Sequence, residues 1–148
     1  MTLTRVQAET ILVKRAGSLM SEAGLAVTFA GSNADLNDPI GWAVRQLGLP
    51  VANILTVADS DLAAVAADDY DQLLDLAEYR LLQNISGNLG VTDIKVGPRE
   101  EKLDQLVQAV EKRLARKKAQ LQQDYGFGLG TLTAGVISLD FMESMEAS

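Results

Sequence analysis

The sequence predicts an all-α fold: a helical bundle of two long antiparallel helices plus an N-terminal helix and short helices, followed by an extended C-terminal arm. Apolar residues recur every three or four positions over three long stretches, which is the spacing of one helix face. Glycine or proline punctuates the ends of these stretches. After Tyr125 the spacing changes and glycines become frequent. We therefore expect a helical bundle domain in residues 1–125 and a glycine-hinged arm in residues 126–148 that contains a short β-strand.

Composition excludes several kinds of chemistry. The 148 residues are enough for one domain with a buried core, and they include neither cysteine nor histidine. Disulfides, thiol nucleophiles, imidazole acid–base catalysis and the usual zinc and haem sites are therefore excluded. No apolar run approaches the roughly 18 residues of a membrane helix, and no leader pattern is present. We expect a protein made in a cytoplasm, with no membrane contact, no enzymatic activity, no cofactor and no metal.

The longest predicted helix covers residues 99–124. Gly97-Pro98 indicates its start, because proline fits the first turn of a helix. Tyr125-Gly126 indicates its end. Acidic residues lie near its start and basic residues in its second half, as the helix dipole favours. Its apolar stripe consists of Leu103, Leu106, Val107, Val110, Leu114 and Leu121. Such a stripe requires a packing partner.

A first helix is predicted from about Thr4 to Ala23. Thr2 or Thr4 could be the N-cap, and Thr4 with Gln7 three residues later resembles a capping box. Gly24 is a suitable residue to end the helix. After a linker, Asp38 and Pro39 read as the N-cap and first residue of a short helix that ends at Gly48. Trp42 in that helix is interpreted as a core anchor, with a subunit contact as the alternative.

Two further helices are predicted in the middle of the chain. Asp59 caps a brief turn, and Asp68 or Asp69 caps a long helix that runs to about Ser86 and is closed by residues 87–90. Some ten residues join this long helix to the one at 99–124. The two helices should therefore lie antiparallel, with their apolar faces in contact. Residues 91–97 could include a short extended piece.

The C-terminal arm reads as a strand without a partner in its own chain. Ile137, Leu139 and Phe141 alternate with residues of the opposite face, and a lone strand needs a sheet edge to pair with. The alternatives are a disordered tail and a tail folded back on the bundle. The partner-binding residues predicted in the arm are Gly126, Phe127, Gly128, Gly130, Val136, Ile137, Leu139 and Phe141.

Charge is divided along the chain. Residues 31–94 carry a balance of −8 and residues 95–124 a balance of +3, within a net charge of −7. The basic residues predicted to lie at a subunit interface or a DNA-lined lumen are Lys112, Arg113, Arg116, Lys117 and Lys118. Acidic and basic regions of neighbouring copies can attract each other, although both can also be solvated faces.

Two other motifs resemble ligand sites only superficially. The segment from Gly126 to Gly130 lacks the strand before it and the helix after it that a phosphate-binding loop requires, so a hinge is the better interpretation. Six aspartates between Asp59 and Asp75 do not have the spacing of a calcium loop and are better explained as capping residues on a solvated face.

Several phrases of the sequence resemble the head-to-tail connector (adaptor) proteins of tailed bacteriophages. They are ILVKRAGSLMSEAGL, the 38–48 helix ending in RQLGL, LLDLAEYRLLQNI, and VGPREEKLDQLVQAVEKRLARKKAQLQQDYG. The resemblance spans roughly residues 5–126 and concerns the order of the helices, the lengths of the linkers and the pattern of residue types. None of these phrases is a catalytic signature.

The resemblance implies a virion protein of the neck region, assembled in the host cytoplasm. It implies a homo-oligomeric ring, commonly of twelve copies, beneath the portal protein, with a lumen through which DNA passes. It also implies arms that reach a neighbouring ring, so the expected partners are the portal protein and a tail-side connector or terminator protein. The alternative from the residues is a small helical nucleic-acid-binding regulator that acts as a dimer and presents the basic run to phosphates.

Overall fold

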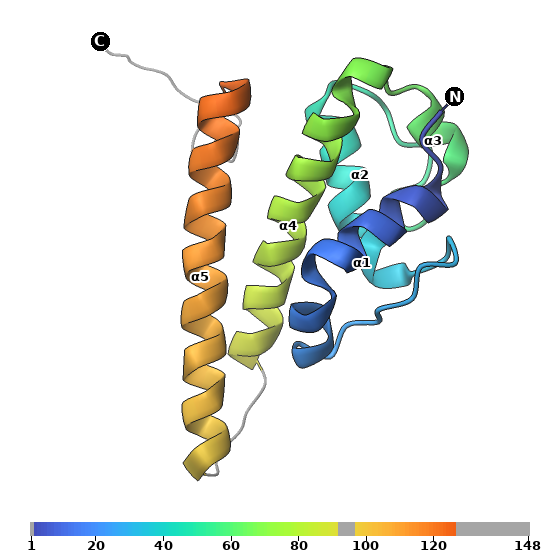
Figure 1. The fold of residues 1–148 in the computed structure, drawn as a ribbon. Coiled ribbons are helices and arrows are strands. Elements are labelled where there is room, and N and C mark those ends of the chain that lie inside the picture. Colours follow the sequence, from blue (N-terminus) through green and yellow to red (C-terminus); the bar gives the residue numbers. More distant parts are fainter. Residues whose placement is uncertain (1, 92–96, 127–148) are drawn as a thin grey trace. The chain divides into compact units, whose positions relative to one another are not determined.

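The computed structural model describes residues 2–91 and 97–126, and this part of the chain is predominantly helical (Figure 1). The α-helices are α1 (Arg5–Glu22), α2 (Asn37–Gln46), α3 (Asp59–Ala63), α4 (Tyr70–Val91) and α5 (Gly97–Tyr125), and the 3-10 turns are η1 (Ala34–Leu36) and η2 (Ala67–Asp69). Residues 2–91 and 97–126 contain no β-strand. The predicted all-α class is confirmed. The strand predicted near residues 136–141 lies outside the described residues.

The chain divides into two units, residues 1–115 and 116–148, and α5 contributes to both. The predicted antiparallel pairing of α5 along α4 stays a prediction.

The ends of α1 form as the sequence predicts. The Thr4 hydroxyl accepts a hydrogen bond from the Gln7 N–H at 3.2 Å, and the Gln7 side chain accepts one from the Thr4 N–H at 3.0 Å. At the other end Gly24 has a φ of 80°, and the Leu25 N–H donates to the Met20 carbonyl at 2.8 Å. This reciprocal capping box and the left-handed glycine satisfy backbone groups that would otherwise lack partners.

The predicted start of α2, with Asp38 as the N-cap and Pro39 as the first helical residue, is wrong by two residues. The helix begins at Asn37 and continues directly from η1, so Leu36 precedes it without a side-chain cap. Asn33 instead caps η1 by accepting the Asp35 N–H at 3.0 Å. Because η1 already turns the chain, the Asp38 carboxylate is left to bind side chains of α4.

The predicted end of α4 near Ser86 is also wrong, since the helix continues through Gly87 to Val91. A Cβ at Gly87 would meet no atom within 4 Å, so nothing packs there that requires glycine. Leu89 is only 1% exposed. Burial of a leucine contributes about 1.5–3 kcal/mol, more than the ~1 kcal/mol that one helical glycine costs.

The core lies where α4 packs against α2 and, less extensively, against α1. Figure 1 shows α4 beside both of these helices. The fully buried large side chains of these helices are Leu12, Met20, Ile40, Leu73, Leu76, Leu81, Leu82, Ile85 and Leu89. Trp42 is half-buried, which corrects its interpretation as a core anchor. Its ring lies beside Tyr79, with 6.3 Å between the ring centroids.

Helix α5 is slightly longer than the predicted 99–124. It begins at Gly97, so Pro98 lies in the first turn as predicted, and it ends at Tyr125. Gly126 has a φ of 72° and its N–H donates to the Gln122 carbonyl at 3.0 Å. Across residues 2–91 and 97–126, no helix has the length and apolar character needed to cross a membrane.

Candidate interaction surfaces

A buried arginine joins three parts of the first unit. Arg5 is 4% exposed, and its guanidinium donates to Glu9 at 2.7 Å, to the Asn37 side chain at 2.6 Å and to the carbonyls of Asn33 and Val57 at 2.7 and 2.8 Å. A buried guanidinium requires such partners, because its charge loses hydration on burial. The contacts tie α1 to the loops on both sides of α2.

Glu9 continues this network from α1 into the loop before α2. It is fully buried, and its carboxylate accepts the N–H groups of Gly31 and Asn33 at 2.7 and 2.9 Å. Asn33 is 2% exposed and its side-chain amide donates to the carbonyls of Ala26 and Thr28. The charged pair therefore fixes the path of residues 24–36, which have no regular structure except η1.

The loop before α3 is fixed in the same way. Asn37 donates to the Leu55 carbonyl at 2.8 Å and accepts the Val57 N–H at 3.2 Å. The buried Asp61 carboxylate accepts the N–H groups of Ala58 and Ala52 at 2.9 and 3.2 Å. Both loops are thus held by buried polar side chains.

These two loops and the first turn of α1 present exposed apolar side chains. The exposed large hydrophobic residues of the described chain are Val6, Val27, Phe29, Ile54 and Leu55. Exposed apolar groups on an ordered backbone are typical of protein-interaction surfaces. No large shift of the backbone is needed before such a surface binds a partner.

A second polar cluster joins α1, α4 and the first part of α5. The Arg15 guanidinium lies 3.1 Å from both Asp75 and Glu78, and the Arg113 guanidinium lies 3.3 Å from Glu78. Arg113 also donates to the Arg15 carbonyl at 2.5 Å. Asp75 and Glu78 are 7% and 6% exposed, so these ion pairs compensate carboxylates that have lost most of their water.

A third cluster lies on the outer surface of α2 and α4. Arg80 binds Asp38 at 2.8 Å and lies 5.7 Å from the centre of the Trp42 ring, while Asn84 donates to Asp38 at 2.9 Å. Burial alone raises the pKa of Asp38, but the hydrogen bonds from Arg80 and Asn84 outweigh it and hold that pKa below the ordinary value. Burial raises the pKa of Tyr79. Glu78 and Arg80, two residues apart on α4, bind different partners: Glu78 pairs with Arg15 and Arg80 pairs with Asp38.

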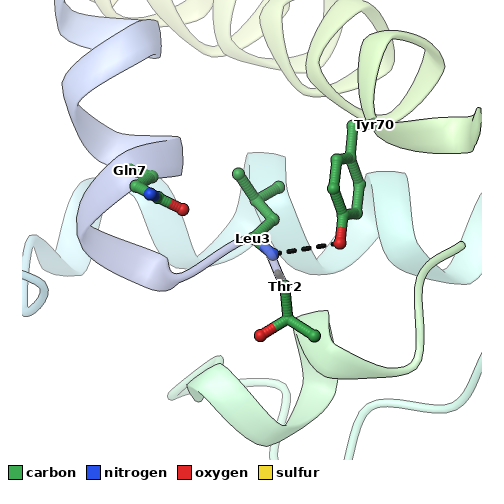
Figure 2. Close-up of a pocket in the computed structure, with 4 residues that line it drawn as sticks. All are labelled: Thr2, Leu3, Gln7 and Tyr70. Atoms are coloured by element: carbon green, nitrogen blue, oxygen red, sulfur yellow. Dashed lines mark hydrogen bonds between the residues drawn. The ribbon is translucent and has the colours of Figure 1, made fainter. Parts of the chain in front are cut away.

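A small open hollow of about 230 Å³ lies at the start of α1 (Figure 2). Thr2, Leu3, Gln7 and Tyr70 line it, and the Tyr70 hydroxyl accepts the Leu3 N–H at 3.1 Å. The lining includes no charged group. The hollow is suited to an apolar side chain rather than to a charged small molecule.

The structure separates the five basic residues that the sequence groups together. Arg113 makes the intramolecular contacts described above, whereas Lys112 is exposed. In the second unit Arg116 is exposed, and Lys117 donates to Gln120 at 3.2 Å. Lys118 is half-buried. Of the predicted arm residues only Gly126 is described, and the others lie outside the described residues.

The acidic middle of the chain divides between structural and exposed groups. Asp61 caps α3, Asp75 pairs with Arg15, and Asp59 accepts the Arg5 N–H at 2.7 Å. Asp68 and Asp71 are exposed near the start of α4. In the part of the chain that the structure describes, no three acidic side chains are placed to hold a metal ion.

Sequence reasoning missed the Arg5 network. The only signal was the spacing of Arg5 and Glu9, four residues apart on a helix, which is typical of an ordinary surface pair. Burial of the pair depends on the two loops that fold over it, and no local pattern indicates that.

Comparisons with known protein families, with curated proteins and with solved structures found no match to this chain.

Proposed function

We propose that this protein is a structural head-to-tail adaptor of a tailed phage. In this role copies form a ring under the portal protein and link it to the tail, with a lumen for DNA passage. The resemblance of residues 5–126 to connector proteins supports the proposal, as does the helical fold. Residues 126–148 act as an arm that docks on a neighbouring protein of the assembly.

The observation that carries the proposal is the segregation of exposed charge. Exposed acids of η2 and of the first turn of α4, such as Asp68 and Asp71, lie on one segment of the chain. Exposed bases of α5, such as Lys112 and Arg116, lie on another. A contact between unlike surfaces of identical copies is heterologous, and such contacts produce rings when the rotation closes. Opposite charges steer such copies together.

The oligomeric state tests the proposal. We expect light scattering to show a ring-sized complex when the protein is mixed with the portal protein of the phage that encodes it. Replacing Lys112 and Arg116 by glutamate should abolish the ring, and replacing Asp68 and Asp71 by lysine in the same chain should restore it. The exposed Lys14→Glu is the matched control, because it changes charge on α1 without touching either surface. A protein that never joins the portal refutes the adaptor role.

The arm has its own test. Deleting residues 127–148 should leave the thermal unfolding of the helical part unchanged and abolish partner binding. A truncated protein that still binds the portal contradicts the role proposed for the arm.

The alternative regulator is tested on short duplex DNA. Its phosphate contacts come from the basic run, in which Arg113 is already held by Glu78 and the Arg15 carbonyl and Lys117 donates to Gln120, so we assign these contacts to Arg116 and Lys118. A salt-dependent mobility shift that is lost on charge reversal at those positions, without portal binding, favours the regulator.

A further inference from the structure

Residues 26–29 present main-chain groups that have no partner in the described chain. The Ala26 N–H donates to Asp35 at 2.8 Å, and the Asn33 amide donates to the Ala26 and Thr28 carbonyls at 2.7 and 2.9 Å. Within residues 2–91 and 97–126, by contrast, the N–H and C=O groups of Val27 and Phe29 make no hydrogen bond. The Ala26 N–H and the Ala26 and Thr28 carbonyls are therefore already bonded, whereas within the described residues the main-chain groups of Val27 and Phe29 are open.

The segment is held in place at both ends and from inside. At one end the Leu25 N–H donates to the Met20 carbonyl. At the other end the N–H of Gly31, which has a φ of 101°, donates to the carboxylate of the buried Glu9. Side-chain amides and carboxylates thus form hydrogen bonds with the main chain of this segment, as a neighbouring strand does in a sheet. An edge that is already ordered loses little entropy when a strand is added to it.

The exposed side chains on this edge suit an apolar strand. Val27 is 40% exposed and Phe29 is 54% exposed. β-Branched and aromatic residues favour strand pairing, and cross-strand pairs between such residues contribute about 0.2–1 kcal/mol each. Residues 26–29 with these two side chains are named the loop edge.

We infer that the loop edge accepts residues 136–141 of a second copy of this chain as an added strand. That segment alternates Ile137, Leu139 and Phe141, and the described residues contain no strand with which it could pair. The ten residues from Gly126 to Val136 can span up to about 33–36 Å, which is enough to reach a neighbouring molecule. Each copy then provides one strand, residues 136–141, and one loop edge that accepts the strand of another copy.

Because the strand of one copy binds the loop edge of the next, the contact joins two different surfaces and is heterologous. Such a contact can repeat around a ring. The inference rests on the proposed function only in taking copies to lie side by side. It names the neighbour on which the arm docks as the adjacent copy, at its loop edge, so deletion of the arm abolishes portal binding by preventing the ring from forming.

Engineered disulfides test the inference directly, because the chain contains no cysteine of its own. F29C protein is mixed with L139C protein under mild oxidation, and the product is analysed on a non-reducing gel. Any F29C–L139C bond in this mixture joins two molecules. We expect a dimer-sized product, formed also with I137C and F141C but several-fold less with S138C and D140C, whose side chains face the other side of a strand.

Two controls keep the test decisive. L55C, at a position 75% exposed on the other loop, replaces F29C and should cross-link only at background level. V27P removes one open N–H without cysteine chemistry and should reduce the association of the full chain, while circular dichroism shows unchanged helix content.

Three results would overturn the inference. They are cross-linking no greater than with L55C, no dependence on the alternation of residues 137–141, or a doubly substituted F29C/L139C chain that closes on itself as a monomer at every concentration. The last result assigns the edge to the chain's own arm. Cross-linking needs no portal, so a protein that cross-links but never joins the portal refutes the adaptor role alone.

Discussion

Replacing Arg5 by methionine tests whether the buried network holds the first unit together. The change keeps most of the side-chain length and removes four donated hydrogen bonds, to Glu9, Asn37 and the carbonyls of Asn33 and Val57. It leaves the Glu9 carboxylate fully buried without a cation. Removing one partner of a buried ion pair costs about 3–5 kcal/mol, and a globular protein has only about 5–15 kcal/mol in total.

The assay is urea unfolding followed by circular dichroism at pH 7. We expect Arg5→Met to lower the free energy of unfolding by about 3–5 kcal/mol. Arg80→Met is the matched control, because Arg80 is also paired with a carboxylate but both side chains are more than a third exposed. Exposed pairs contribute about 0–1 kcal/mol. Adding Glu9→Leu to Arg5→Met should recover part of the loss, since no unpaired buried charge then remains.

The reasoning is refuted if Arg5→Met costs no more than Arg80→Met. It is also refuted if the double variant loses more free energy of unfolding than the two single variants lose when their losses are added. The unpaired carboxylate would then not be the source of the penalty.

Three further outcomes follow from the same structure. Gly87→Ala should raise the free energy of unfolding by about 0.5–1 kcal/mol, because the position is helical and open; a thermal melt that shows a loss contradicts the continuous α4. Glu78→Gln should destabilise the protein by about 1–3 kcal/mol in urea unfolding, because Arg15 and Arg113 both lose a charged acceptor; the surface change Glu111→Gln is its control. The pKa of Asp38 lies below its ordinary value of 3.8, so its stabilisation is present above that pH and is lost as the pH falls through the lower folded value. Asp38→Asn should therefore cost less than about 1 kcal/mol at pH 7, and a gap from wild type that persists unchanged at pH 2 contradicts this assignment.

The sequence determined the helices wherever the signal is local. The capping box of Thr4 and Gln7, the left-handed glycines at 24, 48 and 126, and Pro98 in the first turn of α5 each act within one helical turn. Their energies do not depend on the rest of the chain, so their positions could be read from neighbouring residues.

Where two signals compete, the sequence alone gave the wrong answer. Gly87, Asn88 and Gly90 resemble a helix end, yet the burial of Leu89 extends α4 past them. Asp38 resembles an N-cap, yet η1 has already started the turn and Arg80 binds its carboxylate. In both places a contact from outside the segment outweighs a local preference of about 1 kcal/mol.

The candidate surfaces were decided by tertiary structure. The residue types of the basic run and the arm are visible in the sequence, but whether Arg113 is free or bound depends on Glu78, 35 residues away. The loop edge exists because Arg5, Glu9 and Asn33, buried together, fix a backbone that has no regular pattern of its own. Burial turns ordinary polar residues into a rigid scaffold, since an unpaired buried charge is too costly to leave, and burial is a property of the whole fold.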